Sequence, residues 1–321
     1  MNDRPASPAA ADAVLTVTLN PSLDLSMSVE QFVPDHKLRA FDDRREAGGG
    51  GVNVSRVLRR LDVPTRSFVV VGGAVGSELA SLMRDEELDV FEFTISGTTR
   101  ESVAITEASS GRQYRLSVTG PIVEDADRLR RLIREAAAAV PIVVLSGSLP
   151  QGVPDDFLGQ LVDDLGPATT TIIDTSGAAL DSAAKSAATI IKPSQRELAR
   201  LVGWEPSTAD EVERAAQQIL GHGEIHAVVA SRGPSGALLA TREGVSLWFR
   251  PPPVRPVSTV GAGDSMVAGI AAGIARGEDL VDAVRLGVAA GTATVLSAGT
   301  QLCDPADVST FVEQVTISTP A

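Results

Sequence analysis

An aspartate stands directly behind two glycines in the segment STVGAGDSMVAG (258–269), where a run of small apolar residues begins. This order predicts a helix that starts near Gly261 and carries Asp264 in its first turn. The first N–H groups of a helix have no carbonyl partner and lie at the positive end of the helix dipole, so they can hold an oxyanion. A carboxylate beside them could accept a proton, but an aspartate in a first turn is also a common helix cap. The segment alone leaves both interpretations open.

A second group of glycines, Gly48 to Gly51, precedes a stretch with apolar residues at helical spacing. Glycines permit close approach of a ligand to the backbone, although a tight turn needed only for packing is the alternative. The dinucleotide fingerprint GxGxxG does not fit, because the charged stretch 42–46 stands where a strand is expected. The Walker phosphate loop does not fit the later glycines, because no lysine follows them.

The composition excludes several classes of function. The formal net charge of −13 argues against a protein that follows a nucleic-acid backbone, since that requires a basic surface. The single cysteine, Cys303, cannot form an intramolecular disulfide and fits a reducing compartment. No apolar run reaches about 18 residues, and the N-terminus lacks the pattern of a signal peptide. We therefore expect a cytoplasmic protein with no membrane segment.

Short β-branched runs alternate with segments of helical spacing along most of the chain. Strands that are apolar nearly throughout and separated by helices indicate a mostly parallel sheet covered on both faces. A later pair, 236–241 and 245–250, predicts a hairpin at the edge of that sheet. The other expected strands are 14–19, 67–73, 141–148, 169–176, 189–194 and 227–231, and the expected helices include 52–61, 125–140 and 208–220.

Two segments, 22–29 and 101–118, instead alternate apolar and polar residues. Such alternation predicts strands with one buried and one solvated face. The second segment predicts a hairpin that turns at Ser109 to Gly111. We expect a small separate sheet that lies over a cleft or pairs with another subunit.

We expect one folded domain over residues 14–315 with lid strands from about 22–42 and 100–119, although the length alone also allows two modest domains. The first residues, 1–13, are rich in alanine, proline and aspartate and predict a disordered tail. The closing residues, 316–321, give the same expectation.

Five segments, in this order, closely resemble the motifs of the PfkB or ribokinase-like carbohydrate kinases. They are AGGGGVNVSRVL (47–58), SGSLPQGV (146–153), IKPSQREL (191–198), ASRGPSGALL (230–239) and STVGAGDSMVAG (258–269). The resemblance spans about Leu15 to Asp307. It implies an α/β fold, the ribokinase-like three-layer α/β/α architecture with a mostly parallel central sheet plus a small β-sheet lid.

Within that family the resemblance is closest to PfkB-type 6-phosphofructokinase. The segments TLNPSLDLSMSV, HKLRA and AGTQLC carry it, and the early glycine run lacks the lysine usual in 1-phosphofructokinases. The implied reaction is phosphoryl transfer from ATP to the 1-hydroxyl of fructose 6-phosphate. Asp264 would take the proton from that hydroxyl, and the N–H groups of Gly261, Ala262 and Gly263 would form an anion hole.

The resemblance also implies the residues that bind the sugar phosphate. Lys37, Arg39 and Arg100 would supply cations for its phosphate on the lid side of the cleft. The full implied set is Asp24, Lys37, Arg39, Gly49, Gly50, Asn53, Arg100 and Ser148. A homodimer that packs through the lid sheets is implied as well.

For ATP, the implied residues are Lys192, Ser231, Arg232, Gly233, Pro234, Ser235, Gly236, Thr259, Val288 and Thr292. Glu197 would organise Mg²⁺ largely through water. Ser194 replaces the asparagine of the family motif, which predicts an altered metal or nucleotide affinity rather than loss of activity. Many family members also bind a monovalent cation such as K⁺, and the matching positions here are Ser258, Val260, Thr294, Ser297, Gly299 and Gln301.

Three other functions stay open at this point. Tagatose 6-phosphate or fructose 1-phosphate could be the substrate of the same chemistry. A non-catalytic sugar-phosphate sensor could keep the fold, although a sensor does not need Asp264 beside an anion hole. A dinucleotide-dependent oxidoreductase is disfavoured because its fingerprint is missing.

Overall fold

The computed structural model describes residues 14–138, 140–297, 299 and 301–320. The tail expected over 1–13 lies outside these residues. Within them no helix combines the length and the hydrophobicity needed to cross a bilayer.

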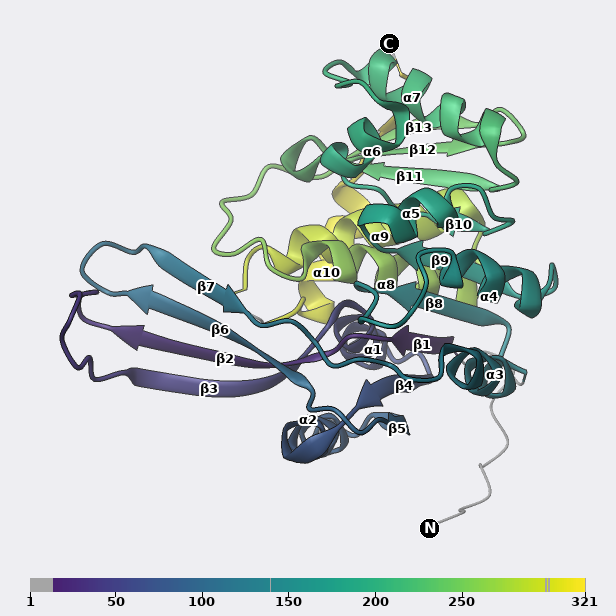
Figure 1. Cartoon of the computed structure of the whole chain (residues 1–321). Coiled ribbons are helices and arrows are strands. Elements are labelled where there is room, and N and C mark those ends of the chain that lie inside the picture. The colour runs from purple at the N-terminus through teal and green to yellow at the C-terminus, as the bar shows by residue number, and fades with distance from the viewer. Residues whose placement is uncertain (1–13, 139, 298, 300, 321) are drawn as a thin grey trace.

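A large twisted sheet forms the middle layer of the molecule, and its central strands run parallel (Figure 1). Every residue of β1 (Val14–Thr18), β8 (Ile142–Ser146) and β12 (Ala237–Thr241) is buried, as a sheet covered on both faces requires. From edge to edge the described strands are β14 (Thr316–Ser318), β13 (Ser246–Arg250), β12 (Ala237–Thr241), β11 (Ala227–Ser231), β10 (Ile190–Ile191), β9 (Thr170–Asp174), β8 (Ile142–Ser146), β1 (Val14–Thr18), β4 (Thr65–Val71) and β5 (Asp89–Thr94).

Helices cover both faces of this sheet, and side chains that alternate along each strand pack against the two helical layers. On β8, for example, Leu145 faces one apolar core and Val144 faces the other. One layer contains α3 (Ala126–Ala137), α4 (Phe157–Leu165), α5 (Gly177–Ala183), α6 (Gln195–Val202) and α7 (Ala209–His222). The other contains α1 (Gly50–Arg60), α2 (Gly73–Asp85), α8 (Ala262–Ala275), α9 (Leu280–Thr294) and α10 (Pro305–Gln314). The expected three-layer, ribokinase-like architecture is confirmed.

A smaller sheet projects from the carboxyl end of β1 as a lid (Figure 1). Strand β2 (Ser22–Val29) lies inside it, parallel to β6 (Arg100–Glu107) and antiparallel to β3 (Phe41–Gly48), while β6 and β7 (Gln113–Ser117) form the expected hairpin. Its strands, in spatial order, are β3 (Phe41–Gly48), β2 (Ser22–Val29), β6 (Arg100–Glu107) and β7 (Gln113–Ser117).

Three local expectations were wrong. The charged stretch 42–46 is not a break but most of β3, and it lacks an apolar face because this edge strand is exposed over residues 41–45. Residues 316–318 of the expected closing tail form β14, which pairs with β13 through Ile317 opposite Phe249. The β12–β13 hairpin is therefore one strand inside the edge of the sheet; residue 321 lies outside the described part of the chain.

Candidate active site

Two cavities meet at the start of α8, on the side of the central sheet where the parallel strands end. The polar cleft holds about 370 Å³ and lies between the strand ends and the base of the lid. The apolar cavity holds about 420 Å³ and lies between α8, α9 and the loop after β13. Ala262 and Gly263 line the apolar cavity, whereas Asp264, the next residue, lines the polar cleft. One helix start therefore faces both.

Asp264 is the third residue of α8, and it does not cap the helix. Gly261 occupies the cap position in a left-handed conformation (φ 76°) that favours glycine. The carboxylate of Asp264 instead accepts a hydrogen bond of 2.8 Å from Asn53 Nδ2, on α1. Burial and the nearby carboxylate of Asp174 raise the pKa of Asp264 to about 7, despite the opposing bond from Asn53. A carboxyl with that pKa can exchange a proton near neutral pH.

Asp174 is a residue of the cleft that the sequence analysis missed. It ends β9, and its Oδ1 lies 3.1 Å from Lys192 Nζ, at the end of the neighbouring strand β10. Burial raises the pKa of Asp174, and the attraction of Asp174 raises the pKa of Lys192 in spite of the burial of the lysine. The signal in the sequence was a charged residue at the end of an apolar run.

The base of the lid supplies Asp24 and Arg100 to the polar cleft. Ser22 Oγ donates a hydrogen bond of 2.6 Å to Asp24 Oδ1. Arg100 donates to the carbonyl of Asn20 and to Ser117 Oγ. Burial raises the pKa of Asp24 and lowers that of Arg100. The cleft also has Gly49, Gly50, Asn53, Ser148 and Glu197 in its wall, together with the unanticipated Ser22, Ser102, Ser146, Gly147, Asp174, Thr175 and Ser176.

Lys37 and Arg39 are not among the residues that line the polar cleft. They belong to the loop between β2 and β3, which lies at the end of the lid away from the central sheet (Figure 1). In a single chain, Arg100 is therefore the cation of the expected set that reaches the cleft.

The walls of the apolar cavity come from segments far apart in the sequence. A proline-rich loop, Pro251 to Pro256, faces Val288 and Met266. Of the residues expected to bind a nucleotide, the cavity collects Ser231, Gly233, Pro234, Gly236, Thr259, Val288 and Thr292. Such a slot, apolar on both sides and ending at free helix N–H groups, fits a purine base and its phosphates.

Arg232 and Ser235 do not line the apolar cavity. The guanidinium of Arg232 lies 5.9 Å from the centre of the Trp248 ring and donates to the carbonyl of Ser207. It is thus used within the protein. Lys192 does not line the apolar cavity either, but its ammonium group lies beside the first turn of α8. A β-carbon built on Gly263 would be 3.5 Å from Lys192 Nζ.

Ser194 caps α6 and also orients Glu197. Its Oγ accepts from the backbone N–H of Glu197, and Glu197 Oε2 accepts a bond of 2.8 Å from the backbone N–H of Ser194. This reciprocal capping box holds the Glu197 carboxylate at the edge of the cleft that contains Asp174. Among the described residues no group of three or more histidine, cysteine or acidic side chains is arranged to hold a metal ion by itself.

The positions expected to hold a monovalent cation come from two segments that touch. Ser258 Oγ donates a hydrogen bond of 3.1 Å to the carbonyl of Gly299. The hydroxyls of Thr294 and Ser297 bond to Ser265 Oγ and to the carbonyl of Leu302. Thr294 is buried, whereas Gln301 is exposed.

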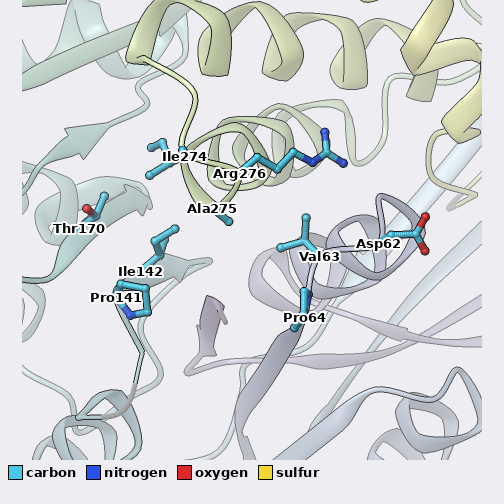
Figure 2. A pocket seen from close by; sticks show the side chains of 10 residues that line it. Asp62, Val63, Pro64, Pro141, Ile142, Thr170, Ile274, Ala275 and Arg276 are labelled. Carbon is cyan, nitrogen blue, oxygen red and sulfur yellow. The ribbon is translucent and has the colours of Figure 1, made fainter. Parts of the chain in front are cut away.

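A further cavity, of about 500 Å³, lies at the opposite end of the sheet (Figure 2). Pro64 and Pro141 line it from just before two of the parallel strands, Thr170 lines it as the first residue of β9, and Arg276 lines it from the end of α8. None of the expected site residues is among those that line this cavity.

The chain is similar to known carbohydrate kinases. The model of the pfkB family carbohydrate kinases matches residues 17–307. The ATP-dependent 6-phosphofructokinase isozyme 2 of Mycobacterium tuberculosis is 40% identical over 303 residues, which cover 94% of this chain and 89% of the relative. The protein of the same name from Escherichia coli is 39% identical over 298 residues, covering 92% and 96%.

Solved structures of phosphofructokinase-2 from E. coli have the same fold. A complex with fructose-6-phosphate aligns with a TM-score of 0.84 at 36% identity, covering 94% of this chain and 98% of that one. A complex with potassium gives 0.86 at 37% identity, and a tetrameric inhibited form gives 0.85 at 36%, both with the same coverage.

Proposed function

The chain belongs to the pfkB family of carbohydrate kinases, and we propose that it transfers the terminal phosphoryl group of ATP to the 1-hydroxyl of fructose 6-phosphate. The products are fructose 1,6-bisphosphate and ADP. The observation that carries this proposal is the start of α8, which faces a polar cleft on one side and an apolar cavity on the other. A sugar phosphate in the cleft and a nucleotide in the cavity would meet at that point.

Asp264 is the general base in this proposal. Its carboxylate accepts the proton of the sugar hydroxyl as the oxygen attacks the phosphoryl group. The free N–H groups at Gly261, Ala262 and Gly263 stabilise the charge on the transferred group, because a fixed donor in a dry site needs no reorganisation. Lys192 Nζ, next to Gly263, adds a positive charge on the same side.

The polar cleft holds the sugar phosphate. Asp24 and Asn53 accept and donate hydrogen bonds to its hydroxyls, while Gly49 and Gly50 let the backbone approach the ring. Arg100 and Ser148 bind its phosphate, the arginine as a planar donor.

The apolar cavity holds ATP, with the base between the proline-rich loop and α9. Mg²⁺, which prefers oxygen ligands and retains water, fits the edge of the cleft where Glu197 and Asp174 present carboxylates. The ion would neutralise charge on the phosphates. A monovalent cation such as K⁺ would bind where the segments around Ser258 and Gly299 touch.

We propose a homodimer that packs through the lid sheets. The lid exposes large apolar side chains, among them Phe41, Tyr114 and Leu116, the last with 56% of its surface exposed. The loop that carries Lys37 and Arg39 lies away from the cleft of its own chain. In such a dimer these two side chains would bind the sugar phosphate in the cleft of the partner. A sedimentation measurement that finds only monomer at assay concentration would contradict this arrangement.

A substrate panel tests the proposed reaction. Release of ADP is measured with ATP, Mg²⁺ and each of fructose 6-phosphate, tagatose 6-phosphate and fructose 1-phosphate. We expect the highest kcat/KM for fructose 6-phosphate. A preference of more than about tenfold for another sugar, or ~1.4 kcal/mol at the transition state, would replace the substrate but keep the chemistry. Binding of the sugars without any turnover would favour the sensor.

The pKa of Asp264 predicts how the rate depends on pH. Asp264 acts as a base only in its carboxylate form. At a pH below its pKa of about 7, most Asp264 side chains are protonated. We therefore expect kcat/KM to rise about tenfold per pH unit up to near pH 7 and then to level off, because this ratio reports groups of the free enzyme. Initial rates at saturating ATP, measured from about 1.5 pH units below that pKa to about 2 pH units above it, test this expectation. A flat profile would argue against Asp264 as the base.

A further inference from the structure

The carboxylate of Asp24 is held by a hydroxyl of its own strand. Ser22 Oγ lies 2.6 Å from Asp24 Oδ1 and donates to it. Ser22 is 3% exposed and lines the polar cleft. A hydrogen bond to a charged acceptor in such a place is shorter and stronger than one between neutral groups.

Gly48 leaves the space that this carboxylate occupies. Ser22 pairs with Gly48 across β2 and β3, and Asp24 pairs with Glu46, so Asp24 and Gly48 are diagonal neighbours on one face. A β-carbon at Gly48 would lie 2.6 Å from Asp24 Oδ1 and closer still to Oδ2. No side chain larger than hydrogen fits there unless the carboxylate moves.

Charged groups from four elements surround Asp24. Arg100 on β6 and Arg56 on α1 favour its ionised form, whereas Glu46 on β3 disfavours it. Asp264 on α8 is close enough for the two carboxylates to repel each other. Burial is the largest influence and raises the pKa of Asp24, and the bond from Ser22 is the largest that opposes it.

We propose that Ser22 is a positioning residue for sugar binding: its hydroxyl fixes the carboxylate of Asp24 in the cleft, in the space that Gly48 leaves free. This inference rests on the proposed function, in which Asp24 binds the hydroxyls of the sugar. A carboxylate held in one orientation binds a hydroxyl without first losing rotamer freedom. Ser22 acts through Asp24 and takes no part in the chemical step.

The variant Ser22→Ala tests the inference on whichever sugar phosphate the wild-type protein phosphorylates best. We expect KM for the sugar to rise at least roughly tenfold, the loss of one hydrogen bond to a charged group, while kcat stays within about twofold. KM for ATP should not change. Ser22→Thr, which retains the hydroxyl, should recover most of the loss, and Ser26→Ala, on the same face of β2, is the matched control.

The pH dependence separates positioning from a general loss of structure. KM for the sugar rises as Asp24 becomes protonated, and the bond from Ser22 lowers the pKa of Asp24. In Ser22→Ala this rise should therefore begin at higher pH than in the wild type. A structural defect would change the melting temperature without shifting the pH at which KM begins to rise.

Gly48→Ala is the second variant, and it should raise KM for the sugar although Ser22 is intact. The inference is overturned if Ser22→Ala has the KM and the pH profile of the wild type. A wild-type protein that turns over a different sugar would correct the proposed substrate and leave this test in place, so the two failures are distinguishable.

Discussion

Replacing Asp264 by asparagine is expected to lower kcat by about 100- to 10,000-fold, the range that a positioned general base contributes. Asparagine has the size of aspartate but cannot accept the proton of the sugar hydroxyl. The amide oxygen can still accept the bond that Asn53 donates, so the cleft should keep its shape. Sugar binding, followed by calorimetry, should weaken far less than turnover.

The same substitution should stabilise the protein above neutral pH. The folded protein holds Asp264 with a pKa of about 7, above the ordinary value of 3.8, so ionisation of this group opposes folding. The penalty grows as pH rises from the lower value to the higher one and is constant beyond it. Asp264→Asn removes the penalty, and its gain in melting temperature should be larger at pH 8 than at pH 5.

Two results would contradict this account. Unchanged turnover in Asp264→Asn would remove the base assignment. A melting temperature that falls at pH 8 would mean that burial does not penalise the ionised form of Asp264. Asp304→Asn, at the exposed cap of α10, serves as a surface control for the charge change.

The central sheet could be predicted because its strands carry their own evidence. The strand expected at 227–231 is β11, and the run 141–148 contains β8, since each strand is apolar up to the serine that ends it. A short apolar run of this kind is typical of a strand that is buried on both faces of a parallel sheet. The lid hairpin followed equally from its alternating pattern.

The wrong predictions concern segments whose structure depends on a distant partner. β3 has charged residues on both faces because it is a lid edge, so no alternation marks it. β14 is only three residues long, too short to show a pattern, and it is a strand because it pairs with the distant β13. Local sequence carries no signal for either.

Site residues could be predicted where they belong to a sequence motif. They could not be predicted where only the order of the strands brings them together. The start of α8 and the Gly49 and Gly50 turn lie in recognisable segments. Lys192 lies in such a segment too, but Asp174 does not, and the two are neighbours because two parallel strands, β9 and β10, end side by side. The absence of Lys37 and Arg39 from the cleft follows from the lid, which carries their loop outward.

Replacing Lys192 by methionine is expected to destabilise the fold by roughly 3–5 kcal/mol, the cost of breaking one partner out of a buried ion pair. The side chains of Lys192 and Asp174 are 5% and 16% exposed, and methionine leaves the carboxylate buried without its counter-charge. Asp174 can respond by binding a proton, because burial already raises its pKa. The loss should therefore be larger at pH 8 than at pH 5, and urea denaturation at both values measures it.

Two further variants isolate the charge pair from its packing. In Lys192→Met with Asp174→Asn, no ion is left unpaired, and part of the lost stability should return. Arg66→Met breaks a more exposed pair with Asp89, at the start of two neighbouring strands, and should cost under about 1 kcal/mol. If Lys192→Met costs no more stability than Arg66→Met, then water must reach Asp174. In that case burial could not raise the pKa of the neighbouring Asp264, and that explanation would be wrong as well.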